Sequence, residues 1–99
     1  MAVKAIERAM GTELPKHQLN YARMVAHLRY AIQRVSNGQP IDNPLTDTII
    51  EKLPQSYEVA MRASQEISMR IKKSVPVEEI SFLAMHIERL KIAMQRTEE

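Results

Sequence analysis

The stretch VEEISFLAMHIERL, residues 77–90, decides the fold of this chain. It follows a proline, and its first turn carries two glutamates, where the positive end of the helix dipole favours acidic side chains. One histidine, His86, lies at the edge of its apolar stripe. The stripe recurs at helical spacing, at Ile80, Leu83, Ile87, Leu90 and Met94. This pattern predicts an amphipathic helix that buries one face and leaves the other in solvent.

Three segments before it show the same helical periodicity: Val3–Met10, His17–Ser36 and Gln55–Lys73. A further short helix, Leu45–Leu53, is predicted because Asn43-Pro44 has the form of an N-cap followed by proline at the first helical position. Gly11 and Gly38 follow the first two, where a glycine readily adopts the left-handed conformation that ends a helix. Short polar or proline-containing breaks separate the segments. We therefore predict a single domain over residues 1–99 that is all-α, a compact antiparallel bundle of about five helices.

The composition narrows the function classes. The chain has 99 residues, of which 44% are hydrophobic and 26% charged, which is ordinary for one globular core. It has no cysteine, so a disulfide framework or a cysteine-bound zinc is excluded. No apolar run reaches the roughly 18 residues of a membrane span, and the N-terminus lacks the apolar core of a signal peptide. We expect a cytoplasmic protein that contacts no membrane.

The charge pattern does not favour direct nucleic-acid binding. The chain has 14 basic and 12 acidic residues, a formal net charge of +2. The basic residues are spread along every predicted helix, whereas a nucleic-acid-binding domain usually gathers them on one face.

Two of the three histidines occupy equivalent positions in their helices. His27 and His86 each precede a core aliphatic residue at the boundary between the apolar and the polar face. Arginines lie within one or two turns of them: Arg23 and Arg34 on the earlier helix and Arg89 on the later one. The third histidine, His17, has no such setting, and we interpret it as a helix-start or solvent residue.

Histidines in such positions allow several interpretations. The commonest is a partly buried residue bonded to a carboxylate or a carbonyl. A metal site would need three or four ligands on one face, and neither histidine has acidic neighbours at that spacing. The chain has no Gly-x-Ser-x-Gly elbow and no glycine-rich phosphate loop, so we expect neither a catalytic residue nor a cofactor. A neutral imidazole with cationic neighbours could also accept a phosphoryl group, because the cations would hold the phosphate oxygens.

The spacing of several anchored segments resembles the PTS regulation domain. These segments are Tyr21 with His27-Leu28, Ala31-Ile32 with Arg34, Pro54 with Tyr57 and Ala60, and Pro76 with Glu79, Phe82-Leu83, His86-Ile87 and Arg89-Leu90. The family occurs in bacterial transcriptional antiterminators of the BglG and LicT type and in related regulators. The chain is most similar to the second such domain of an antiterminator, since the first typically has Asp where this chain has Ala26.

The resemblance implies a five-helix all-α fold and a regulatory role. It implies that His27 and His86 are phosphorylated by the sugar phosphotransferase system, through the phosphocarrier HPr or a sugar-specific enzyme II. It also implies that phosphorylation shifts a homodimer between arrangements and thereby controls an RNA-binding domain elsewhere in a longer protein. From the spacing alone we expect Arg23, Arg34 and Arg89 to contact phosphate.

Two other hypotheses stay open at this point. The chain could be a helical nucleic-acid-binding module, or a dimerisation bundle in which both histidines are structural. For the phosphorylated domain we expect a charge switch, because each phosphate adds about −2. Four apolar residues are expected to face away from the core and to mark a dimer seam: Val59, Met69, Met85 and Ile92.

Overall fold

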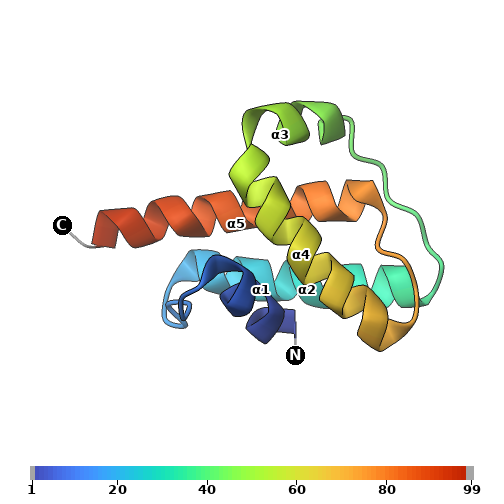
Figure 1. The fold of residues 1–99 in the computed structure, drawn as a ribbon, viewed down its shortest axis with the longest axis horizontal. Coiled ribbons are helices and arrows are strands. Elements are labelled where there is room, and N and C mark those ends of the chain that lie inside the picture. Colours follow the sequence, from blue (N-terminus) through green and yellow to red (C-terminus); the bar gives the residue numbers. More distant parts are fainter. Residues whose placement is uncertain (1, 98–99) are drawn as a thin grey trace.

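The structure is a computed structural model that describes residues 2–97. This part of the chain forms five α-helices and no strand, so the predicted all-α class is confirmed (Figure 1). The helices are α1 (Ala2–Met10), α2 (Leu19–Ser36), α3 (Thr46–Lys52), α4 (Pro54–Ile71) and α5 (Val77–Thr97). Helix α5 is the longest of the five, with 21 residues.

The helices pack as crossed pairs. Helices α2 and α5 run antiparallel side by side, and α1 lies along α4 in the same manner (Figure 1). Helix α4 crosses α5, and the short α3 closes one end by packing on both. Helix α5 thus contacts α2, α3 and α4, which makes it the central element of the fold.

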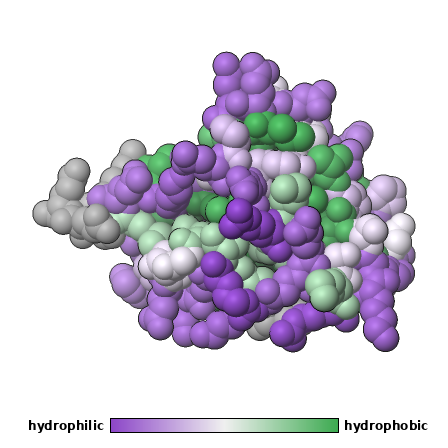
Figure 2. Space-filling model, in the orientation of Figure 1, coloured by the Kyte–Doolittle hydropathy of each residue, from purple (hydrophilic) through white to green (hydrophobic). Residues whose placement is uncertain are grey.

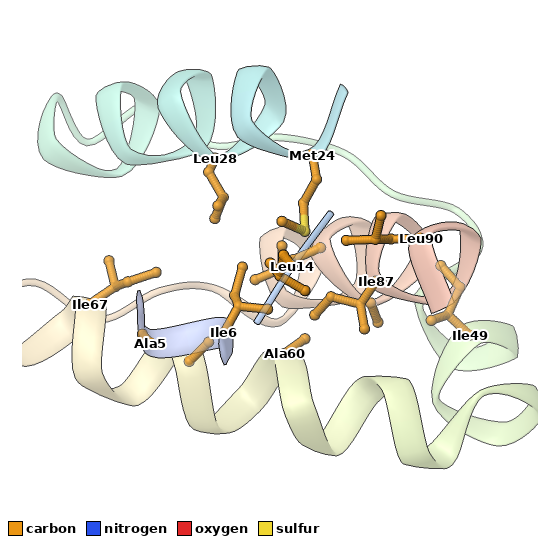
Figure 3. Close-up of a cluster of buried hydrophobic side chains, with 13 residues drawn as sticks. Ala5, Ile6, Leu14, Met24, Leu28, Ile49, Ala60, Ile67, Ile87 and Leu90 are labelled. Carbon is orange, nitrogen blue, oxygen red and sulfur yellow. The ribbon is translucent and has the colours of Figure 1, made fainter. Parts of the chain in front are cut away.

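The core is formed where these pairs meet. Met24 and Leu28 of α2 point into the cluster, where Met24 approaches Ile87 and Leu90 of α5 and Leu28 lies on the side of Ile6 of α1 (Figure 3). All of these side chains are at most 5% exposed. Burying each contributes about 1.5–3 kcal/mol, so this cluster holds α1, α2 and α5 together.

Most helix ends lie within one residue of the predicted bounds, and two differ by two residues. Gly11 and Gly38 both have positive φ, at +73° and +67°, as expected of residues that end helices. Helix α4 stops earlier than predicted because Lys72 adopts a left-handed conformation with φ of 58°. Helix α2 begins two residues later than predicted, since His17 lies exposed in a turn that the Gln18 amide closes by donating to the Pro15 carbonyl.

The prediction of four outward-facing apolar residues was wrong for two of them. Val59 and Met85 are partly buried against the core, whereas Ile92 and Met69 are 39% and 79% exposed. Met85 is covered because α5 has neighbours on several sides and therefore no single solvent face. The surface in Figure 2 is mostly hydrophilic, with separate hydrophobic clusters near α3 and α4.

Across residues 2–97, no helix combines the length and the apolar character that crossing a membrane requires.

Candidate functional site

The two edge histidines meet in the fold. The rings of His27 on α2 and His86 on α5 lie with their centroids 4.7 Å apart and their planes inclined by 32°. The antiparallel pairing of α2 and α5 causes this contact, because it places matching edges of the two helices opposite each other. The sequence predicted equivalent positions for the two histidines, but it did not predict that they touch.

A second pair spans the same two helices. Arg34 donates from Nε to Glu79 Oε2 and from Nη2 to Glu79 Oε1, both at 2.8 Å. Arg34 follows His27 by seven residues on α2, and Glu79 precedes His86 by seven on α5. Seven residues are two helical turns, roughly 10 Å along the axis. We call these four residues the α2–α5 seam: a histidine stack and a two-pronged ion pair, two turns apart.

Glu79 is the seam residue that sequence reasoning missed. It was interpreted as a first-turn acid that suits the helix dipole, yet it is only 2% exposed and faces α2. Its spacing did hold a signal, because residue 79 is in phase with the buried positions Leu83 and Ile87. A carboxylate in phase with a core stripe needs a partner, since an unpaired buried charge is costly. The partner, Arg34, could be identified only from the fold.

His27 is the more enclosed of the two histidines. Its Nε2 atom is buried and, among the described residues, has no hydrogen-bond partner. The ring of Phe82 lies 5.9 Å away, and a mainly apolar cavity of about 20 Å³ adjoins the imidazole. Burial lowers the pKa of His27 from 6.5 to about 4; His86 and Arg34 act in the same direction, and Glu79 partly opposes them. The imidazole is therefore neutral at physiological pH.

His86 lies in a more cationic setting. Burial lowers its pKa, and the charges of Arg89 and Arg23 lower it further. Arg89 belongs to the same helix as His86, whereas Arg23 reaches it from α2. Two of the three arginines singled out from the sequence thus act on His86. The third, Arg34, already has the Glu79 carboxylate as its partner.

The arrangement suits nucleophilic chemistry by an imidazole nitrogen. Both rings are held neutral, which leaves each with one lone pair, and guanidinium groups stand near the ring of His86. Within residues 2–97 no three side chains of the His, Asp or Glu type are grouped as metal ligands. A buried nitrogen of a structural histidine normally has a hydrogen-bond partner. Nε2 of His27 has none among the described residues.

Comparisons with known proteins bear on the family of the chain. The family model described as PRD domain matches residues 1–90. The chain is 33% identical over 92 residues to a β-glucoside operon antiterminator from Dickeya chrysanthemi, with 81% of this chain and 32% of that protein covered. It is 28% identical over 90 residues to the PtsGHI operon antiterminator of Bacillus subtilis (strain 168), with 89% and 32% covered.

A further relative from the same strain is the transcription antiterminator LicT, 32% identical over 81 residues, with 79% of this chain and 29% of LicT covered. The chain therefore spans about a third of the length of these relatives. No solved structure matches the chain.

Proposed function

This chain belongs to the PRD domain family, and we propose that it is the phosphorylatable regulatory domain of a bacterial transcription antiterminator or a related regulator. The observation that carries the proposal is the contact between His27 and His86, two neutral imidazoles held 4.7 Å apart at the α2–α5 seam. The three relatives described above are named antiterminators, which supports the regulatory role. In this proposal residues 1–99 are one domain of a longer protein, and a separate domain binds RNA.

The reaction is phosphoryl transfer from a phosphohistidine of the sugar phosphotransferase system, on HPr or a sugar-specific enzyme II. The lone pair of a neutral imidazole nitrogen on this domain attacks the phosphorus. A nitrogen–phosphorus bond forms here while the nitrogen–phosphorus bond of the donor breaks, and its electron pair returns to the donor imidazole. The acceptor ring loses its remaining proton, and the donor ring takes one up, so the exchange balances. The domain is the substrate, and the donor supplies the activation.

The arginines support this transfer unequally. Burial lowers the pKa of His86, and the charges of Arg89 and Arg23 lower it further, which supports a role for both arginines beside this imidazole. These guanidinium groups can hold the oxygens of a phosphate on His86 as charge-assisted donors. Arg34 is engaged with Glu79, so contact with a phosphate would require it to leave that carboxylate.

The consequence of phosphorylation is a local change of charge. One phosphohistidine takes the formal charge of the chain from +2 to about 0, and two take it to about −2. In a homodimer whose interface includes the α2–α5 seam, the new dianion either pairs with arginines of the second copy or repels the phosphate on that copy. The dimer arrangement then passes the state of the sugar transport system to the output domain.

The test is to incubate the purified domain with phosphoenolpyruvate and the general phosphotransferase proteins. Acid-labile phosphate is expected on His27 and His86, and its loss in His27→Ala or His86→Ala identifies the acceptor. His17→Ala is the matched control, because His17 is exposed and lies outside the seam. No phosphate on either seam histidine would refute the proposed function. Native mass spectrometry before and after the reaction reports whether the oligomeric state changes.

A further inference from the structure

The two seam histidines differ in how a phosphoryl donor could reach them. Nε2 of His27 is buried and unpartnered, and the cavity beside the ring measures only about 20 Å³. That volume is close to the room that one water molecule needs, so it cannot hold a phosphoryl group. The His86 ring stacks against one side of His27, and Phe82 lies against another.

From this asymmetry we propose that the Arg34–Glu79 ion pair is a latch that makes His86 the first phosphoryl acceptor and withholds His27 until α2 and α5 separate. The proposal rests on the proposed function and specifies how its site is regulated. Glu79 and Arg34 are positioning residues in it, because they act through the placement of the His27 ring and do not touch the phosphoryl group.

The geometry of the seam supports the latch. Exposing Nε2 of His27 requires its ring to move away from α5, and the ion pair joins the same two helices only two turns further along. Both prongs of the pair are 2.8 Å long, and the Glu79 side chain is 2% exposed. Separating the helices there would leave a buried carboxylate without its cation, which opposes opening. Glu79 lines the same cavity as the His27 ring, and the charges of Glu79 and Arg34 both act on that ring, so the latch and His27 are adjacent.

Direct passage of a phosphoryl group from His86 to His27 is not favoured by the stack. The lone pair of an imidazole nitrogen lies in the plane of the ring, whereas the two rings face each other with planes inclined by only 32°. In-line transfer needs the attacking and leaving nitrogens aligned through phosphorus. The closed seam therefore separates the two acceptors, and His27 depends on an external donor after opening.

The first experiment measures accessibility without any phosphoryl donor. Diethyl pyrocarbonate acylates accessible neutral imidazole nitrogens, and mass spectrometry of peptides resolves the three histidines. In the unaltered domain the exposed His17 serves as the reference, and His86 is expected to react next. His27 is expected to react at least about tenfold more slowly than His86, because only the fraction of molecules with α2 and α5 separated exposes its Nε2. Equal rates for His27 and His86 would overturn the proposal.

The second experiment releases the latch. Glu79→Gln keeps the size of the side chain and removes the charge that Arg34 grips, so the reaction of His27 is expected to rise about tenfold while that of His17 stays unchanged. Glu78→Gln is the matched control, with the same chemical change one residue away on α5 and no ion pair to Arg34. An equal His27 rate in the two variants would overturn the proposal.

Folding of each variant is checked by circular dichroism. If Glu79→Gln does not fold, Arg34→Lys takes its place, since lysine keeps the charge but cannot form the two-pronged contact.

The unaltered chain and the same variants are then phosphorylated. In the unaltered chain, His86 is expected to be phosphorylated before His27. The order should be lost in the latch variant. Absence of phosphate on both histidines together with the expected acylation order would refute the proposed function and leave the latch standing as a control of accessibility.

Discussion

Replacing Arg34 by methionine should destabilise the domain strongly. The change keeps most of the side-chain volume but leaves the Glu79 carboxylate, 2% exposed, without its cation. Removing one partner of a buried ion pair typically costs 3–5 kcal/mol. The Arg34 side chain is 26% exposed, so water can reach part of the site, and we expect a value near the lower end, about 3 kcal/mol.

That loss is large for a chain of this size. A domain of 99 residues has about 5–15 kcal/mol of stability in total. A loss of about 3 kcal/mol should lower the melting temperature by roughly 12–24 °C, at 4–8 °C for each kcal/mol. Urea denaturation followed by circular dichroism measures the free energy of unfolding, and an unchanged slope shows that the native fold is retained.

The double variant Arg34→Met/Glu79→Leu separates the lost partner from lost packing. It replaces the ion pair by two apolar side chains, and such replacements are often neutral or stabilising, so we expect its stability within about 1 kcal/mol of the unaltered chain. Arg62→Met is the exposed control, because Arg62 pairs with Glu58 on one helix surface and should change stability by at most about 0.5 kcal/mol. The reasoning about a buried latch is refuted by a loss below about 1 kcal/mol in Arg34→Met.

Three further outcomes are expected. Because the fold lowers the pKa of His27 from 6.5 to about 4, the unfolded chain binds a proton more readily; this part of the stability is complete above pH 6.5 and is lost as pH falls toward about 4. At full burial this pKa difference would correspond to about 3.4 kcal/mol, and solvent screening at the half-buried ring reduces it to about 1–2 kcal/mol. Urea titrations of His27→Asn should therefore show a flatter pH profile. Arg89→Gln should raise the pKa of His86, measured by NMR titration, because a nearby cation is removed; an unchanged pKa would contradict the assigned cause. Lys72→Gly should raise the melting temperature by several degrees, since Lys72 holds a φ of 58° that glycine adopts at a cost about 1 kcal/mol lower; a lower melting temperature would show that the Lys72 side chain matters more than its backbone.

The local features of this protein follow from its sequence. Helical periodicity identified four of the five helices, the start signal Asn43-Pro44 identified α3, and the glycines at 11 and 38 marked two helix ends. These features are local because a helix forms from hydrogen bonds between residues four apart, and its apolar stripe shows directly in the spacing. The same stripes placed His27 and His86 at the edge of the core, where the structure finds both half-buried.

Tertiary structure alone decided how these edges combine. Packing against the core leaves Met85 and Val59 partly buried, although periodicity had placed both outside. The antiparallel approach of α2 and α5 brought His27 onto His86 and joined Arg34 to Glu79, residues that the sequence separates widely. Periodicity gives the direction of a side chain relative to its own helix axis, but a contact between two helices depends on their register and crossing, which the packing of the whole core determines.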